Sequence, residues 1–332
     1  MASIATVFGG SGFVGRYIVQ RLAKAGWRVR VAVRRPNEAI FVRPYGVPGQ
    51  VEPVFANIRH DSSVAESMNG ANAVINCVGI LVESQAQSFD SLHCDAVRRI
   101  AQIASSEGVS RLVHISSIGA DAASESNYAR TKGEGELALA EMFPRSVILR
   151  PSIIFGPEDQ FFNRFSTLAR LSPIVPVVSG KSRFQPVFVG DVSLAALYAV
   201  ENDDFSGIYE LGGPEILSFH DLMIRMLSVI RRRRLVLDIP LPLARLKAGA
   251  FDILQFASGG LFTNRLLTRD QIKQLARDNI VSDGTKSFSD LNISPTTMES
   301  VLESYLYRFR PAGQFATIHE SAELFQNDGR GG

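Results

Sequence analysis

The stretch Ile4-Ala-Thr-Val-Phe8 followed by Gly9-Gly-Ser-Gly-Phe-Val-Gly15 decides the fold of this chain. Its first five residues are the kind of short apolar run that forms a buried strand of a parallel sheet. Behind the glycines, apolar residues recur four apart from Val14 to Leu22, which predicts a helix. Alternating valines over Arg28–Val33 then predict a second strand. The sequence therefore predicts a strand, glycine turn, helix and strand in succession.

The three glycines of this turn have separate physical roles. Gly9 permits a tight turn, Gly12 lets the backbone approach a pyrophosphate, and Gly15 lets the helix pack close to the strand. Phosphates would then meet free N–H groups at the positive end of the helix dipole. The alternative is a glycine-rich turn that serves packing alone. On the first interpretation the turn lines a dinucleotide with Gly9, Ser11, Gly12, Phe13, Val14 and Gly15.

Two arginines at the end of the second strand indicate which dinucleotide is bound. An NAD site places Asp or Glu there for the ribose hydroxyls, whereas this chain has Arg34 and Arg35. Guanidinium groups pair bidentately with a 2′-phosphate, and each charge-assisted bond contributes about 1.5–3 kcal/mol. Arg16 adds a third candidate cation. The sequence predicts NADP(H) as the preferred cofactor over NAD(H); the alternative is that these arginines are solvated surface residues.

The middle of the chain continues the alternation of strands and helices. Strands are expected at Val51–Phe55, Ala73–Val78 and Leu112–Ile115, with helical stretches at Ser63–Met68 and Phe89–Ser106. Such alternation predicts an α/β fold with a doubly wound parallel sheet of the Rossmann type. Ligands bind beyond the carboxyl ends of such strands. The predicted lining there comprises Asn57, Ile58, Cys77, Val78, Gly79 and Ser116.

The chemical candidates are Tyr128 and Lys132, four residues apart and therefore on one helix face, together with Ser117. A phenol near pKa 10 is a poor base, and Lys⁺ about 4 Å away would supply roughly the 4 kcal/mol needed to lower it. Tyr128 would then exchange a proton with a substrate oxygen that Ser117 holds, while a nicotinamide transfers hydride. The alternative is that Lys132 binds the nicotinamide ribose and Tyr128 fills the pocket without turnover.

Composition excludes several other classes of protein. The 332 residues carry 35 Lys and Arg against 33 Asp and Glu, so net charge gives no case for nucleic acid binding. The two cysteines, Cys77 and Cys94, lack the spacing of a metal or disulfide framework, and no metal site is predicted. Cys77 is more typical of a small buried residue than of a nucleophile. This cysteine usage favours a reducing compartment such as the cytoplasm.

A smaller, interleaved C-terminal α/β domain is expected beyond the first sheet. Strand character returns at Phe184–Val189 and Ile208–Leu211, and a helix is expected at Phe219–Ile230. The predicted organisation is a dinucleotide-binding domain at 1–156 with strands returning at about 184–212, a smaller domain at 157–183 and 213–326, and a flexible tail at 327–332.

The run Arg231–Arg234 is the strongest local concentration of charge. One interpretation is a solvated helix end, where cations complement the dipole. The other is docking to an anionic membrane surface or an acidic partner, with Leu241, Leu243 and Leu246 as apolar flanks.

The glycine spacing, Ser117 and the Tyr128–Lys132 pair together resemble the short-chain dehydrogenase/reductase superfamily in its extended or atypical branch. The segments Leu149–Arg164 and Arg183–Asp191 are similar to the NAD(P)-binding accessory subunits of respiratory complex I. This resemblance covers most of residues 1–215.

The resemblance implies a peripheral-arm subunit of complex I that holds NADPH as a structural element, with Lys132 and Pro151 near the nicotinamide. The competing function is an active NAD(P)-dependent reductase, epimerase or dehydratase that uses Ser117, Tyr128 and Lys132. Since no transit peptide is recognised, the expected location is the cytoplasm of a bacterium, peripheral to its inner membrane.

Overall fold

The computed structural model describes residues 2–84, 87–239, 269–311 and 313. A seven-stranded sheet, in the order β11-β6-β5-β4-β1-β2-β3, forms its centre, and every neighbouring pair is parallel. The predicted doubly wound parallel sheet is confirmed, and its order reverses between β1 and β4. The strands are β1 Ile4–Phe8, β2 Arg28–Val33, β3 Val51–Phe55, β4 Ala73–Asn76, β5 Arg111–Ile115, β6 Val147–Pro151 and β11 Gly207–Leu211.

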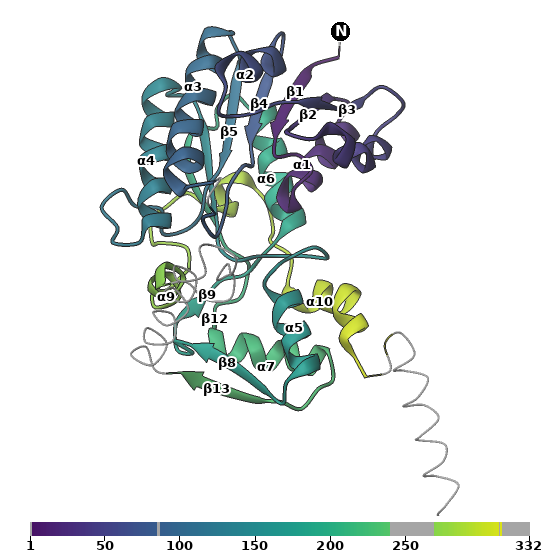
Figure 1. Cartoon of the computed structure of the whole chain (residues 1–332), viewed down its shortest axis with the longest axis vertical. Coiled ribbons are helices and arrows are strands. Elements are labelled where there is room, and N and C mark those ends of the chain that lie inside the picture. Colours follow the sequence, from purple (N-terminus) through teal and green to yellow (C-terminus); the bar gives the residue numbers. More distant parts are fainter. Residues whose placement is uncertain (1, 85–86, 240–268, 312, 314–332) are drawn as a thin grey trace, which may run out of the picture.

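Helices cover both faces of this sheet, as Figure 1 shows. Because successive side chains of a strand point to opposite faces, Val7 packs toward one helical layer and Phe8 toward the other. The first layer consists of α1 Phe13–Lys24 and α6 Val189–Glu201. The second consists of α2 Asp61–Met68, α3 Ala96–Ser106 and α4 Asn127–Met142. Two apolar cores, one on each face, therefore hold the sheet in place. They also fix the edge at which the carboxyl ends of its strands lie.

A smaller C-terminal region lies beyond that edge (Figure 1). Its core is rich in phenylalanine, with Phe155, Phe162, Phe184 and Phe219 all buried. The main elements are α5 Phe162–Leu171, β8 Ile174–Val178, α7 Phe219–Val229, β13 Leu235–Ile239, α9 Arg269–Leu275 and α10 Met298–Leu306. Among the described helices, none is both long enough and apolar enough to cross a bilayer. The expected tail at 327–332 lies outside the described residues.

The strand expected over Phe184–Val189 is wrong. The chain there forms β9 Arg183–Phe184, which pairs with β12 Leu217–Ser218, and β10 Val187–Phe188, which pairs with β7 Ile154–Phe155. Pro186 separates the two because it has no N–H to donate to a ladder. Only β11, expected from Ile208, returns to the main sheet.

The helix expected over Phe89–Ser106 is not uniform. It opens as a π-helix, η2 Asp90–Asp95, before α3 continues it. Single turns of π-helix are rare and concentrate at functional sites. A Cβ on Gly135 of α4 would lie 1.9 Å from the His93 carbonyl oxygen, so this glycine permits the close contact of η2 with α4.

Candidate functional site

The glycine turn between β1 and α1 is closely packed on its inner side and open on its outer side. Gly9 has φ +72°, and a Cβ on Gly15 would lie 2.3 Å from the Gly9 carbonyl oxygen, so neither position accepts a side chain without strain. A Cβ on exposed Gly12 would meet only the Gly9 oxygen, at 3.1 Å. The backbone around Gly12 therefore faces open space.

The amino terminus of α1 is free to bind an anion. Gly12 is its N-cap, no side chain caps it within the part of the chain that the structure describes, and its first turn has no acidic residue. The first N–H groups of a helix have no intrahelical partners and carry partial positive charge. Arg16 donates to the Ser11 and Gly12 carbonyls at 3.2 and 3.3 Å and lies 3.5 Å from the Glu158 carboxylate. This turn fits a pyrophosphate.

The two arginines beyond β2 have different partners. When the Gln87 amide is oriented to satisfy both its polar ends, its oxygen accepts from both terminal nitrogens of Arg34 at 2.7 and 3.0 Å. Arg35 is exposed and forms an ion pair with Glu38 at 2.9 Å. A neutral amide holds Arg34, so its positive charge stays available for a phosphate.

Asn57 and Ile58, which follow β3, are engaged by local contacts. The Asn57 oxygen accepts from the Arg59 N–H at 3.2 Å, in a tight turn of the backbone. Ile58 is buried in the second apolar core, and its carbonyl accepts from Arg99 at 3.0 Å. Asn57 therefore lies beyond the carboxyl end of β3, as expected, and its side-chain oxygen is hydrogen-bonded within that turn.

The end of β4 meets the glycine turn. The Cys77 N–H donates to the Phe8 carbonyl at 3.0 Å, and a Cβ on Gly9 would lie 3.2 Å from the Val78 side chain. A Cβ on Gly79 would lie 3.6 Å from the Lys132 Nζ. Burial raises the pKa of Cys77 to about 12, as expected for an unreactive thiol. The sheet edge thus brings the residues after β1 and β4 together with Lys132.

Ser117, Tyr128 and Lys132 do not show the activation expected from the sequence. The Lys132 ammonium is buried and donates to the Ile115 carbonyl at 3.1 Å. Burial lowers the pKa of Lys132 to about 8, and burial raises the pKa of Tyr128 above its usual value, which the Ser117 hydroxyl offsets only in part. The expected lowering of the Tyr128 pKa is therefore wrong, because burial dominates and the Asp270 carboxylate raises the pKa further. The buried Ser117 Oγ forms no hydrogen bond of ordinary geometry among the described residues, although it lies near enough to Tyr128 to lower that phenol's pKa, so it can also approach a ligand.

Ser116, expected to line the cofactor, instead faces α4. Its hydroxyl donates to the buried carboxylate of Glu136, which pairs with Arg150. Arg150 also lies 3.5 Å from Glu210. Pro151 ends β6, and its carbonyl accepts from the Ile118 N–H at 3.0 Å. This ionic network fixes the strand ends beneath the site.

Two residues next to Tyr128 escaped the sequence analysis. His93 of η2 lies with its ring 5.3 Å from the Tyr128 ring. Asp270 of α9 accepts from the Ser126 hydroxyl at 2.9 Å and from the N–H groups of Asn127 and Tyr128 at 2.7 and 3.2 Å, so it caps α4. Asp270 and Tyr128 are 142 positions apart in the sequence, so no local pattern would reveal this cap.

Two arginines of the run Arg231–Arg234 donate hydrogen bonds to backbone carbonyls elsewhere in the molecule. Arg232 donates to the Phe309 carbonyl and Arg234 to the Ala169 carbonyl, each at 2.8 Å. Arg231 and Arg233 are exposed. The flanking residues Leu241, Leu243 and Leu246 lie outside the described residues.

Two further features bear on ligands. Within the described ranges, no group of three or more His, Cys, Asp or Glu side chains is arranged to hold a metal ion. A cavity of about 600 Å³ opens beyond β11, between Gly212 and the segment Ser287–Pro295. None of the predicted site residues is among the residues that line it.

Comparison with known proteins agrees with this geometry. The NAD dependent epimerase/dehydratase family model matches residues 5–212. A mitochondrial NADH dehydrogenase [ubiquinone] 1 alpha subcomplex subunit 9 from Arabidopsis thaliana is 33% identical over 316 residues, which cover 93% of this chain and 79% of that protein. A ceramide reductase from Caulobacter vibrioides is 33% identical over 208 residues, covering 63% of this chain and 64% of that one.

Among solved structures, the Bordetella bronchiseptica enzyme WbmH, determined in complex with NAD⁺, superposes with a TM-score of 0.68. The match covers 94% of this chain and all of WbmH at 15% identity, so it shows the fold alone. The sheet order, the open glycine turn and the family match over most of the sheet lead to one assignment. The chain belongs to the NAD dependent epimerase/dehydratase family, for which NAD(P) binding is expected, and it is related to mitochondrial complex I subunits.

Proposed function

We propose that the chain is an accessory subunit of respiratory complex I that holds NADP(H) mainly as a structural element. The observation that carries this proposal is the contrast between a glycine turn that is open to an anion and a pair, buried Lys132 and half-buried Tyr128, in which the Tyr128 pKa is raised and not lowered. The relationship to the Arabidopsis complex I subunit supports it independently. The partners would be peripheral-arm subunits of that complex.

The preference for NADP(H) rests on Arg34. Its guanidinium lies beyond β2 and is held by the neutral Gln87, so a 2′-phosphate would gain a charge-assisted pair there. Arg35 contributes less, because Glu38 already neutralises it.

A bound nicotinamide would supply hydride-transfer chemistry, and this chain's residues would position the nucleotide. The α1 N–H groups would hold the pyrophosphate. Lys132 would donate to ribose hydroxyls, and the Ser117 hydroxyl would bond a polar group of the ligand. Because the pKa of Tyr128 is raised, its hydroxyl stays protonated and donates a hydrogen bond instead of accepting a proton.

Purification from native membranes tests this function. The chain should be isolated through an affinity tag, with mass spectrometry of its protein partners and of the extracted nucleotide. We expect the respiratory core subunits and NADPH at about one per chain. Isolation of the chain alone, free of nucleotide, would contradict the proposal.

An active reductase, epimerase or dehydratase is the second candidate. It is favoured by the position of the Ser117 hydroxyl, which lies near enough to Tyr128 to lower its pKa, and by the similarity to a ceramide reductase. This function requires that NADPH oxidation with an added carbonyl substrate be lost in Tyr128→Phe. Equal rates in wild type and Tyr128→Phe would exclude it.

The exposed Arg231 and Arg233 suggest where the proposed subunit meets a membrane. Each cation near an anionic surface contributes about 1 kcal/mol. Flotation with phosphatidylglycerol vesicles should weaken when both arginines become Gln and should not change in Lys24→Gln at the exposed end of α1. Unchanged flotation in the double variant would remove this contact. The proposed location is the cytoplasmic side of a bacterial inner membrane.

A further inference from the structure

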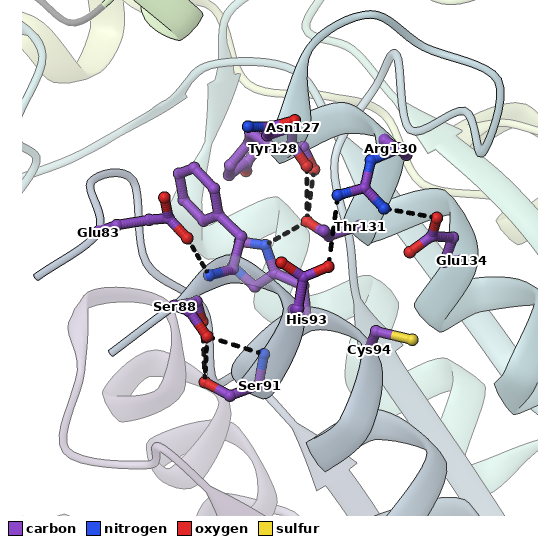
Figure 2. A network of polar contacts seen from close by, with 12 residues as sticks. Glu83, Ser88, Ser91, His93, Cys94, Asn127, Tyr128, Arg130, Thr131 and Glu134 are labelled. Atoms are coloured by element: carbon purple, nitrogen blue, oxygen red, sulfur yellow. Dashed lines mark hydrogen bonds and ion pairs between the residues drawn. The ribbon is translucent and has the colours of Figure 1, made fainter. Parts of the chain in front are cut away.

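His93 connects two parts of the candidate site through its two ring nitrogens, and Figure 2 shows the contact of one of them with Thr131. Its Nε2 accepts from the Ile80 N–H at 3.1 Å, in the turn that follows β4. An accepting Nε2 leaves the proton on Nδ1 in the neutral ring. Nδ1 therefore donates to the Thr131 Oγ1 at 3.3 Å. One imidazole thus links the turn after β4 to helix α4.

Thr131 connects His93 by further hydrogen bonds to the first turn of α4. Its hydroxyl donates to the Asn127 carbonyl at 2.8 Å and approaches the Tyr128 carbonyl at 3.2 Å (Figure 2). Burial, with a smaller contribution from Lys132, lowers the pKa of His93 to about 3. The ring therefore stays neutral near pH 7 and keeps a single tautomer.

The imidazole also fixes the Tyr128 ring. His93 is 1% exposed and stacks on Phe89 with ring centroids 5.2 Å apart. The Tyr128 ring meets both of them edge to face, at 5.3 Å from His93 and 5.7 Å from Phe89. Such edge-to-face pairs contribute about 0.5–1.5 kcal/mol beyond burial. The rings of His93 and Phe89 thus hold one orientation of the Tyr128 side chain.

His93 also approaches the part of the site where Lys132 lies. A Cβ placed on Gly79 would be 3.8 Å from the His93 Nε2 and 3.6 Å from the Lys132 Nζ. The π-helix η2 and Gly135 together bring the His93 backbone this close to α4. The π-helical turn η2 thus places the His93 imidazole close to Gly79, Tyr128 and Lys132.

We propose that His93 is a positioning residue for the part of the site that would hold the nicotinamide. It links the turn at Ile80 to Thr131 by hydrogen bonds, and its ring packs on the ring of Tyr128. The inference rests on the proposed nucleotide site. It predicts that His93 matters for the nicotinamide half of the ligand and not for the adenosine half, which the glycine turn and Arg34 would hold.

Two ligands and two variants test this inference by calorimetric titration. NADPH contains both halves, whereas 2′-phospho-ADP-ribose lacks the nicotinamide. His93→Phe keeps an aromatic ring but loses both hydrogen bonds, and we expect its affinity for NADPH to fall about tenfold while its affinity for 2′-phospho-ADP-ribose changes less than about twofold. His93→Gln offers both an acceptor and a donor and should restore NADPH affinity to within about threefold of wild type.

Thr131→Val removes the Nδ1 partner together with the hydroxyl's bond to the Asn127 carbonyl, and it provides a further, milder variant should His93→Phe fail to fold. We expect it to weaken NADPH binding about threefold and to leave 2′-phospho-ADP-ribose unchanged. Equal weakening of both ligands, or of neither, in the folded variants would overturn the positioning role. If the wild-type protein binds neither ligand, the proposed nucleotide site is wrong and this inference falls with it.

Discussion

The two ends of the candidate site, the glycine turn and the surroundings of Tyr128 and Lys132, differ in how their polar groups are used. At the glycine turn, the first N–H groups of α1 have no capping side chain among the described residues, and Arg34 has a neutral amide as partner. At the other end, Lys132 is buried against the Ile115 carbonyl and Tyr128 has a raised pKa. One end offers helix N–H groups and a guanidinium to an anion, and at the other end burial dominates the pKa values of Tyr128 and Lys132.

On the proposed function, this difference would let a family fold keep nucleotide binding while its catalysis weakens. Binding at the glycine turn depends on the backbone and on helix geometry, which a few glycines secure. Catalysis depends on the balance between desolvation and nearby charge at a single phenol. Burial is the largest influence on the pKa values of both Tyr128 and Lys132. Substitutions at each end of the site test this contrast between binding and catalysis.

Gly15→Ala should have the largest effect on the binding end. Its Cβ would lie 2.3 Å from the Gly9 carbonyl oxygen and 2.7 Å from the Gly10 Cα, and both are backbone atoms that cannot move without distorting the turn. We expect NADPH affinity to fall by more than about 100-fold, with a lower melting temperature. Gly12→Ala, on the open side, should weaken NADPH binding with less loss of stability. Wild-type affinity in Gly15→Ala would contradict this account of the turn.

Arg34→Gln should remove the cofactor preference. Losing charge-assisted bonds to a 2′-phosphate should weaken NADPH binding about 10- to 100-fold and leave NADH binding nearly unchanged. Arg35→Gln is the matched control, since Glu38 already pairs with that side chain, and it should have a much smaller effect. Titrations of both cofactors into the three proteins measure this. Equal losses in the two variants would show that Arg34 has no special role.

Lys132→Met should stabilise the protein while it weakens nucleotide binding. A pKa of about 8 in place of the usual 10.5 corresponds to about 3 kcal/mol against folding at pH 7, and loss of the bond to Ile115 offsets about 1 kcal/mol of the gain. We expect urea titrations to show about 1–2 kcal/mol of added stability at pH 7.

The pH dependence provides the control for Lys132. Because the folded pKa is lowered, the unfolded chain binds more protons between pH 8 and 10.5, so wild-type stability rises with pH across that window. The advantage of Lys132→Met should therefore shrink over the same range. An advantage that does not depend on pH would mean that the buried charge is not its cause.

Asp270→Ala should have the smallest effect, because it removes a helix cap. We expect a loss of about 1 kcal/mol and faster hydrogen exchange at the amides of Asn127 and Tyr128. Lys273→Ala is the matched control on the same helix, since it loses only a bond to the Glu125 carbonyl. Unchanged exchange in Asp270→Ala would show that α9 does not hold α4.

The sequence predicted most of the sheet and, in the C-terminal region, the helix α7 at Phe219–Val229. β1, β2 and β3 were predicted with the observed bounds because their apolar runs are interrupted by clear turns. The prediction of a single strand failed at Phe184–Val189. The segment is largely apolar, but Pro186 divides it into two short strands that belong to different two-stranded sheets. Apolar pattern alone does not reveal which partner strand a segment meets.

The candidate site was predictable where backbone geometry determines it. The glycine spacing indicated the turn at Gly9–Gly15, since close packing leaves room for little else. The state of Tyr128 was not predictable, because its desolvation depends on Phe89 and His93, which a π-helix brings to it. The orientation of Ser116 likewise depends on Glu136 of α4, twenty residues away.

Calorimetric titration of NADPH and NADH into the purified wild-type protein tests the central claim most directly. A nucleotide cradled by the glycine turn and recognised by Arg34 should give one site per chain, with NADPH bound at least about tenfold more tightly than NADH. No binding of either nucleotide, or equal affinity for both, would contradict the account.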